Sequence, residues 1–116
     1  MDIIVAAAEA LQPISSRGIV VKQGWYDESL KKTHITLWNL SDAEEGYSDD
    51  TNEAAEGYLQ VNIWAEYDAE DLKAEVKKLL KGSGFYYQDG NDAEESKPKI
   101  FNKAMRFYRM QEEGEN

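Results

Sequence analysis

The chain has 116 residues, of which 41% are hydrophobic and 11% aromatic, and this composition is typical of one folded domain rather than of a disordered chain. It contains no cysteine, so a disulfide framework, a thiolate metal site and a cysteine nucleophile are excluded for this chain. Its net charge of −10 repels phosphate groups and anionic lipid, and no run of residues is apolar enough to span a membrane, so we expect neither direct nucleic-acid binding nor membrane insertion.

The first forty residues predict one helix and two strands. Residues 2–11 are rich in alanine and place apolar residues on one helical face, and Pro13 is expected to end that helix. Residues 19–26 and 33–40 are rich in β-branched and aromatic residues, which favours strands. A polar turn at residues 27–32 is expected to separate the two strands.

An acidic stretch at residues 41–56 interrupts this pattern. Seven of its residues are acidic and none is basic, which is typical of a solvated loop. We therefore expect a long, exposed and mobile loop here, and long loops in compact domains are often functional.

Residues 57–67 carry the clearest strand pattern in the chain. Apolar residues alternate with polar and aromatic ones, so one face of the strand is expected to meet the core and the other to face outward. The outward face would carry Tyr58 and Trp64, and such aromatics indicate either a partner surface or ordinary decoration of a sheet. The expected core positions are Leu59, Val61, Ile63 and Ala65.

The second half of the chain predicts a helix followed by two closing strands. Residues 69–81 have an apolar stripe, acids in the first turn and lysines toward the end, with Asp68 as the expected N-cap. Residues 85–88 and 99–109 are typical of an antiparallel pair joined by a polar loop, and the tail at 111–116 is expected to fray.

The order of these elements predicts the fold class. Helix, two strands, acidic loop, strand, helix and two strands give the order α-β-β-β-α-β-β, in which helices and antiparallel strands are segregated. The sequence therefore predicts a single α+β domain over residues 1–116, with a mainly antiparallel sheet and two helices packed on one face.

No recognisable catalytic or metal-binding set is present in the sequence. His34 is the one histidine, and its mid-strand position predicts a structural or an exposed role. The acidic runs at 49–53 and 89–92 lack the spacing of a calcium loop, and nucleotide-binding and serine-hydrolase motifs are missing. We therefore expect a protein that is not an enzyme and has no cofactor or metal. Loose cation binding and an enzyme with a small carboxylate site stay open as lesser alternatives.

Basic residues gather near the end of the chain, at Lys99, Lys103, Arg106 and Arg109. Lys103 and Arg109 would share one face of the last strand with its apolar residues. Two uses remain open for them, namely a self-association surface that meets the acidic loop of a neighbouring copy, or a set of internal salt bridges.

Several stretches, taken in order, resemble one known family. They cover residues 3–109 and are THITLWNL, the Asp49–Asp50 loop, VNIWAEYDAEDLKAEVKKLL, GSGFYYQDG and FNKAMRFYR. In this order and spacing the chain resembles the small tail-terminator or tail-completion proteins of long-tailed bacteriophages and prophages. The resemblance implies a structural virion protein, assembled in the bacterial host cytoplasm, that forms a ring, commonly a hexamer, on the end of the tail tube. Such a ring stops tube polymerisation and offers a surface to the head connector.

The resemblance also implies roles for two sets of residues. The acidic loop would reach the tail-tube protein and the head–tail connector through Asp42, Glu44, Glu45, Tyr47, Asp49 and Asp50. The sheet would mediate self-association through a surface made of Tyr58, Trp64, Lys103 and Arg109. The charge leaves one alternative function open, an acidic inhibitor or nucleic-acid mimic that blocks a basic binding groove.

Overall fold

The computed structural model describes residues 2–27, 29–30, 32–40, 55–94 and 100–110. The predicted acidic loop, apart from its last two residues, and the predicted frayed tail lie outside these ranges. The helices are α1 (Ile3–Ala10), α2 (Gln12–Ser15) and α3 (Glu70–Gly82). The strands are β1 (Val20–Gln23), β2 (His34–Asn39), β3 (Ala55–Ala65), β4 (Phe85–Glu94) and β5 (Phe101–Met110).

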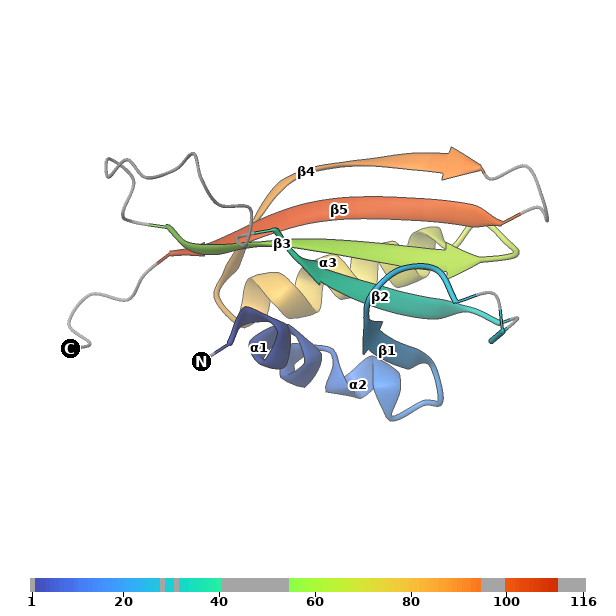
Figure 1. Cartoon of the computed structure of the whole chain (residues 1–116), viewed down its shortest axis with the longest axis horizontal. Coiled ribbons are helices and arrows are strands. Elements are labelled where there is room, and N and C mark those ends of the chain that lie inside the picture. The colour runs from blue at the N-terminus through green and yellow to red at the C-terminus, as the bar shows by residue number, and fades with distance from the viewer. Residues whose placement is uncertain (1, 28, 31, 41–54, 95–99, 111–116) are drawn as a thin grey trace.

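The five strands form one mixed sheet in the order β1-β2-β3-β5-β4, and in the described part of the chain the three helices lie on one side of it (Figure 1). Three of the four strand pairs are antiparallel, which confirms the predicted α+β class with a mainly antiparallel sheet. The first pair differs from the prediction, because β1 and β2 run parallel. A tight turn cannot join parallel strands, so the connection at residues 24–33 has to cross over one face of the sheet.

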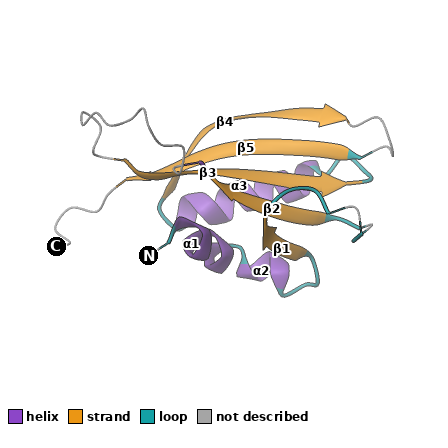
Figure 2. Cartoon of the chain, in the orientation of Figure 1, coloured by secondary structure: helices purple, strands orange, loops and turns teal. Residues whose placement is uncertain are grey.

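Figure 2 shows the helices on one side of the sheet, and the buried side chains of the hydrophobic core come from both the helices and the strands. The four core positions predicted for the central strand are confirmed, since all four are buried, but Asn62 and Trp64 of the other set are buried as well. Neighbouring strands add Ile35, Leu37, Phe85, Met105 and Phe107, and the helical segments add Ala7, Leu11, Ile14, Leu72, Val76 and Leu80. No helix in the described ranges is long and apolar enough to cross a bilayer.

The described residues form three helices where the sequence predicts two, because the N-terminal helical segment continues into the short helix α2. The Asp2 carboxylate caps α1 by accepting a hydrogen bond of 3.1 Å from the Ile4 N–H. Pro13 was expected to end helical structure, but it lies in the first turn of α2, where its missing N–H leaves no hydrogen bond unmade. This second short helix brings Leu11 and Ile14 into the core, where both are fully buried.

The helix α3 forms where the sequence predicts it, but its start differs. Ala69 occupies the N-cap position without a side-chain hydrogen bond, so the prediction of Asp68 as the N-cap is wrong. The Asp68 carboxylate instead lies 2.6 Å from the buried Lys103 ammonium. The Arg17 guanidinium holds the outer side of the helix through two hydrogen bonds of 2.8 and 2.9 Å to Glu75.

The strand β4 continues through residues that the sequence predicts as loop. Its polar run from Asp89 to Glu94 pairs with β5 after an irregularity in register between Tyr87 and Asp89. Gly90 is required there, because a Cβ at this position would lie 2.6 Å from the Ala104 carbonyl oxygen. Polar residues fit an edge strand because one side of it meets solvent, so polarity alone is a poor signal of a loop.

Candidate functional site on the open face of the sheet

The face of the sheet that no described helix covers is called the open face. Strand register and side-chain alternation place four residues of β3 and four of β5 on it, together with residues of β2 and β4. Its described side chains include His34, Thr36, Trp38, Tyr58, Gln60, Asn62, Trp64, Tyr86, Asp89, Asn102, Ala104, Arg106 and Tyr108. This face is aromatic at two places and polar between them.

The connection at residues 24–33 crosses one part of the open face. Gly24 turns the chain with a φ of +127° and donates its N–H to the Leu37 carbonyl. The rings of Trp25 and Tyr26 then lie 5.2 and 5.1 Å from that of Trp64. Trp64 faces the predicted side of the strand, but it is only 2% exposed, so the expectation that it is an outward-facing surface residue is wrong. The strand pattern correctly predicts the face on which the Trp64 side chain lies, but it does not predict that the loop covers this side chain.

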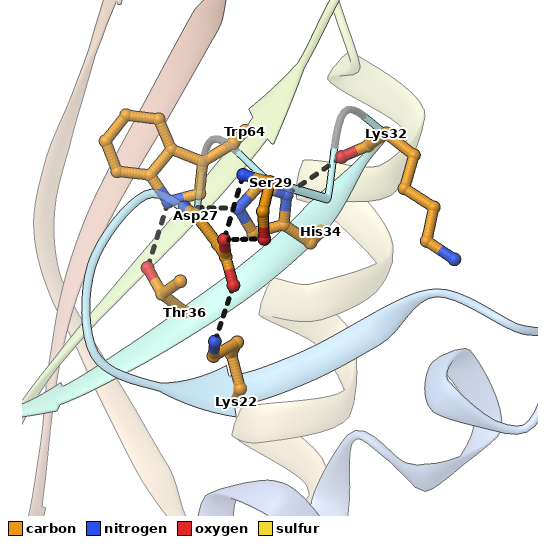
Figure 3. Close-up of polar contacts among 7 residues, drawn as sticks. All are labelled: Lys22, Asp27, Ser29, Lys32, His34, Thr36 and Trp64. Atoms are coloured by element: carbon orange, nitrogen blue, oxygen red, sulfur yellow. Dashed lines mark hydrogen bonds and ion pairs between the residues drawn. The ribbon is translucent and has the colours of Figure 1, made fainter.

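Polar contacts hold this loop against the sheet (Figure 3). The Trp64 Nε1–H donates a hydrogen bond of 2.9 Å to the Thr36 hydroxyl. The His34 Nε2 accepts the Asp27 N–H at 3.2 Å, so its Nδ1 carries the proton and donates to the Lys32 carbonyl at 2.8 Å. His34 is buried and uses both ring nitrogens to fix the loop, which is the structural role among the two that the sequence leaves open.

The Asp27 carboxylate accepts several of the hydrogen bonds that hold the loop. Its carboxylate accepts a hydrogen bond of 2.8 Å from the Lys22 ammonium and two, at 2.6 and 3.0 Å, from the Ser29 hydroxyl and N–H. The Lys22 hydrogen bond is the main cause that lowers the pKa of Asp27 to about 2, and the Ser29 bonds add to it.

Protonation of Asp27 at low pH should lower the free energy of unfolding. Because its pKa is lower in the folded protein, the ionised carboxylate stabilises the fold above pH 3.8, and this contribution is lost as the pH falls toward about 2. The gap in unfolding free energy between the native protein and Asp27→Asn should therefore narrow over this range, as followed by urea unfolding at each pH. Lys22→Met should behave like Asp27→Asn, and a gap independent of pH would contradict the assignment.

Three tyrosines from neighbouring strands form a second aromatic group, here called the tyrosine ladder. Tyr108 of β5 lies between Tyr58 of β3 and Tyr86 of β4, with ring centroids 6.2 and 5.3 Å apart. Tyr58 and Tyr86 are 37% and 51% exposed, and Trp38 on the same face is also exposed. The ladder is thus an apolar patch in contact with solvent.

A polar hollow of about 320 Å³ lies on the same face, over β3, β5 and β4. Gln60 donates a hydrogen bond of 2.8 Å to the Asn62 side-chain oxygen, and Asn62 donates one of 2.8 Å to that of Asn102. Across the hollow, the Arg106 Nε lies 3.1 Å from the Asp89 carboxylate. The lining is completed by Trp25, Gly90 and Ala104.

The structure separates the residues of the predicted self-association surface. Tyr58 lies on the open face and Trp64 beneath the loop, whereas Lys103 and Arg109 lie on the helix side of β5. Lys103 is 2% exposed, and its ammonium lies 2.6 Å from Asp68 and 2.9 Å from Glu70, which is the internal salt bridge left open as the second use. The Arg109 guanidinium lies over the Phe85 ring, on the same side. These four residues therefore do not form one surface.

Sequence reasoning identified one member of the tyrosine ladder and missed the other two. Tyr86 and Tyr108 alternate correctly along their strands, but their meeting with Tyr58 depends on which strands are neighbours. The six predicted partner-binding residues between Asp42 and Asp50 lie outside the described residues.

In the ranges that the structure describes, no group of three or more acidic or histidine side chains is placed to hold a metal ion. Comparison with known proteins gives no family to which the chain can be assigned, because no protein-family model and no curated protein matches the sequence.

Proposed function

We propose that this chain is a structural virion protein that caps the tail tube of a long-tailed phage as a ring and helps to join tail to head. It acts by binding other proteins and other copies of itself. The observation that supports self-association is the tyrosine ladder, in which the exposed Tyr58 and Tyr86 flank Tyr108. Exposed aromatic patches of this kind are typical of protein interfaces.

The charge distribution supports contact between copies on the open face. Two copies that each carry −10 repel one another, so a contact surface between them has to avoid unpaired acids. The tyrosine ladder carries no charge, and the described Arg106 and Asp89, which lie next to it on the open face, form an ion pair. The acidic stretch at 41–56 is then left to meet the tube protein or the connector, as the family resemblance implies.

The test compares two tyrosines of nearly equal exposure. Tyr86 in the ladder is 51% exposed, and Tyr67 in the connection between β3 and α3 is 52% exposed. Native mass spectrometry and electron microscopy of the purified protein should show a ring of several copies. Tyr86→Glu should weaken assembly by on the order of tenfold or more, because it places a charge in the contact, whereas Tyr67→Glu should leave the ring intact. A native protein that stays monomeric at high concentration and does not bind tail-tube protein would overturn the proposal.

A further inference from the structure

The polar hollow is lined by two small residues, Ala104 and Gly90, and by longer side chains around them. Ala104 lies on the open face of β5 between Asn102 and Arg106, whose longer side chains line the same hollow. The volume of about 320 Å³ falls at the lower end of the range for small-ligand sites, ~300–1,000 Å³. The hollow is therefore large enough for a small molecule and is bounded by side chains of strands and of the covering loop.

The wall of the hollow on the loop side is an indole ring held in place. Trp25 makes edge contacts with Trp64 at 5.2 Å and with Trp38 at 6.4 Å, with interplanar angles of 74° and 85°. About half of its surface nevertheless stays exposed. A fixed and exposed indole is a suitable platform for the C–H face of a sugar ring, because an aromatic side chain binds apolar surface at little entropic cost.

The floor of the hollow consists of primary amides in a fixed orientation. Each amide offers two N–H donors and one acceptor oxygen. Asn62 is only 1% exposed, and its hydrogen bonds to Gln60 and Asn102 orient these two half-buried amides and use only part of their capacity. Hydroxyl groups both donate and accept, so neighbouring hydroxyls of one ligand can pair with this set.

Other classes of ligand fit this lining less well. The pairing of Arg106 with Asp89 leaves the hollow without net charge, so an ionic ligand gains no counter-ion there. An apolar ligand would remove the amides from water without replacing their hydrogen bonds. A peptide that adds to a sheet pairs along the free edge of β4, whereas the hollow lies on the face of the sheet and is also lined by side chains of β3 and β5.

We propose that the polar hollow binds a neutral saccharide, with one ring against Trp25 and its hydroxyls on Gln60 and Asn102, which the buried Asn62 holds in orientation. The lining of the hollow includes none of the three ladder tyrosines, but Gln60 and Arg106 are the open-face residues next to Tyr58 and Tyr108, so the two proposals are tested with separate variants.

The test is a titration of the full chain, ¹⁵N-labelled, with glucose, galactose, N-acetylglucosamine, maltose and lactose at millimolar concentrations. A saturable shift is expected in the side-chain amide signals of Gln60, Asn62 and Asn102 and in the Trp25 indole signal. Ala104→Leu fills the hollow without removing a polar group and should weaken binding tenfold or more. Absence of a saturable shift with every sugar of this panel would overturn the proposal, as would stronger shifts with a neutral extended peptide.

Two further variants keep the result interpretable. Gln60→Ala removes one hydrogen-bonding group and should weaken binding even if Ala104→Leu does not fold, as judged by the dispersion of the amide spectrum. Tyr86→Glu, which is designed to disrupt the tyrosine ladder, should bind the sugar as the native protein does. If Tyr86→Glu loses assembly but still binds the sugar, or assembles but no longer binds it, the two proposals are distinguished. Equal sugar binding by the native protein, Gln60→Ala and Ala104→Leu would contradict the proposed saccharide site.

Discussion

Replacement of Trp64 by alanine should lower the free energy of unfolding by about 3–5 kcal/mol, the usual cost of removing a large buried aromatic side chain. Trp64 is 2% exposed, packs against Trp25 and Tyr26, and donates its indole N–H to Thr36. The variant leaves a cavity under the loop and an unused hydroxyl below it. Urea unfolding followed by circular dichroism measures the change.

The matched control is Trp38→Ala on the same face of the sheet. Trp38 is 47% exposed, so its loss should cost no more than about 1 kcal/mol. Equal losses for the two variants would show that the loop does not cover Trp64 in solution. The comparison therefore distinguishes a buried tryptophan from the outward-facing residue that the strand pattern predicts.

Removal of the two carboxylates beside Lys103 should also be strongly destabilising. The Lys103 side chain is 3% exposed and its ammonium contacts Asp68 and Glu70, whereas those carboxylates are 61% and 60% exposed. The double variant Asp68→Asn/Glu70→Gln replaces two charged partners of the buried ammonium by neutral amides, and the loss of hydrogen bonds between charged groups costs about 1.5–3 kcal/mol. Thermal or urea unfolding at neutral pH gives the value.

Because the Lys103 ammonium is buried whereas its two carboxylate partners are exposed, we expect a different outcome for Lys103→Met. This variant keeps the apolar stem and removes the buried charge, and the two carboxylates left behind remain solvated. Its stability should therefore stay within about 1.5 kcal/mol of the native protein. If Lys103→Met loses as much stability as the double variant, the salt bridge is not the reason for the effect. Lys103→Met should also assemble normally, because the side chain is internal rather than part of a contact surface.

The periodic elements could be predicted from the sequence because periodicity is a local property. The alternation from Leu59 to Ala65 and the apolar stripe of Leu72, Val76 and Leu80 identify the buried faces of β3 and α3 without knowledge of their neighbours. The errors fall where a residue has a nonlocal partner. Asp68, in the connection between β3 and α3, pairs with Lys103 of β5 instead of capping a helix, and the polar end of β4 pairs with β5 instead of forming a loop.

The sequence by itself determined that the chain forms an acidic α+β domain with a mainly antiparallel sheet, and it determined which residues of the central strand and of α3 face the core. Only the tertiary structure decided that β1 runs parallel to β2, that the loop at 24–33 buries Trp64, and that Tyr58, Tyr108 and Tyr86 meet. The polar hollow beside Ala104 is likewise visible only in the tertiary structure. The physical reason is that hydrophobic periodicity states which way a side chain points, whereas strand order and the path of a connection decide what it meets there.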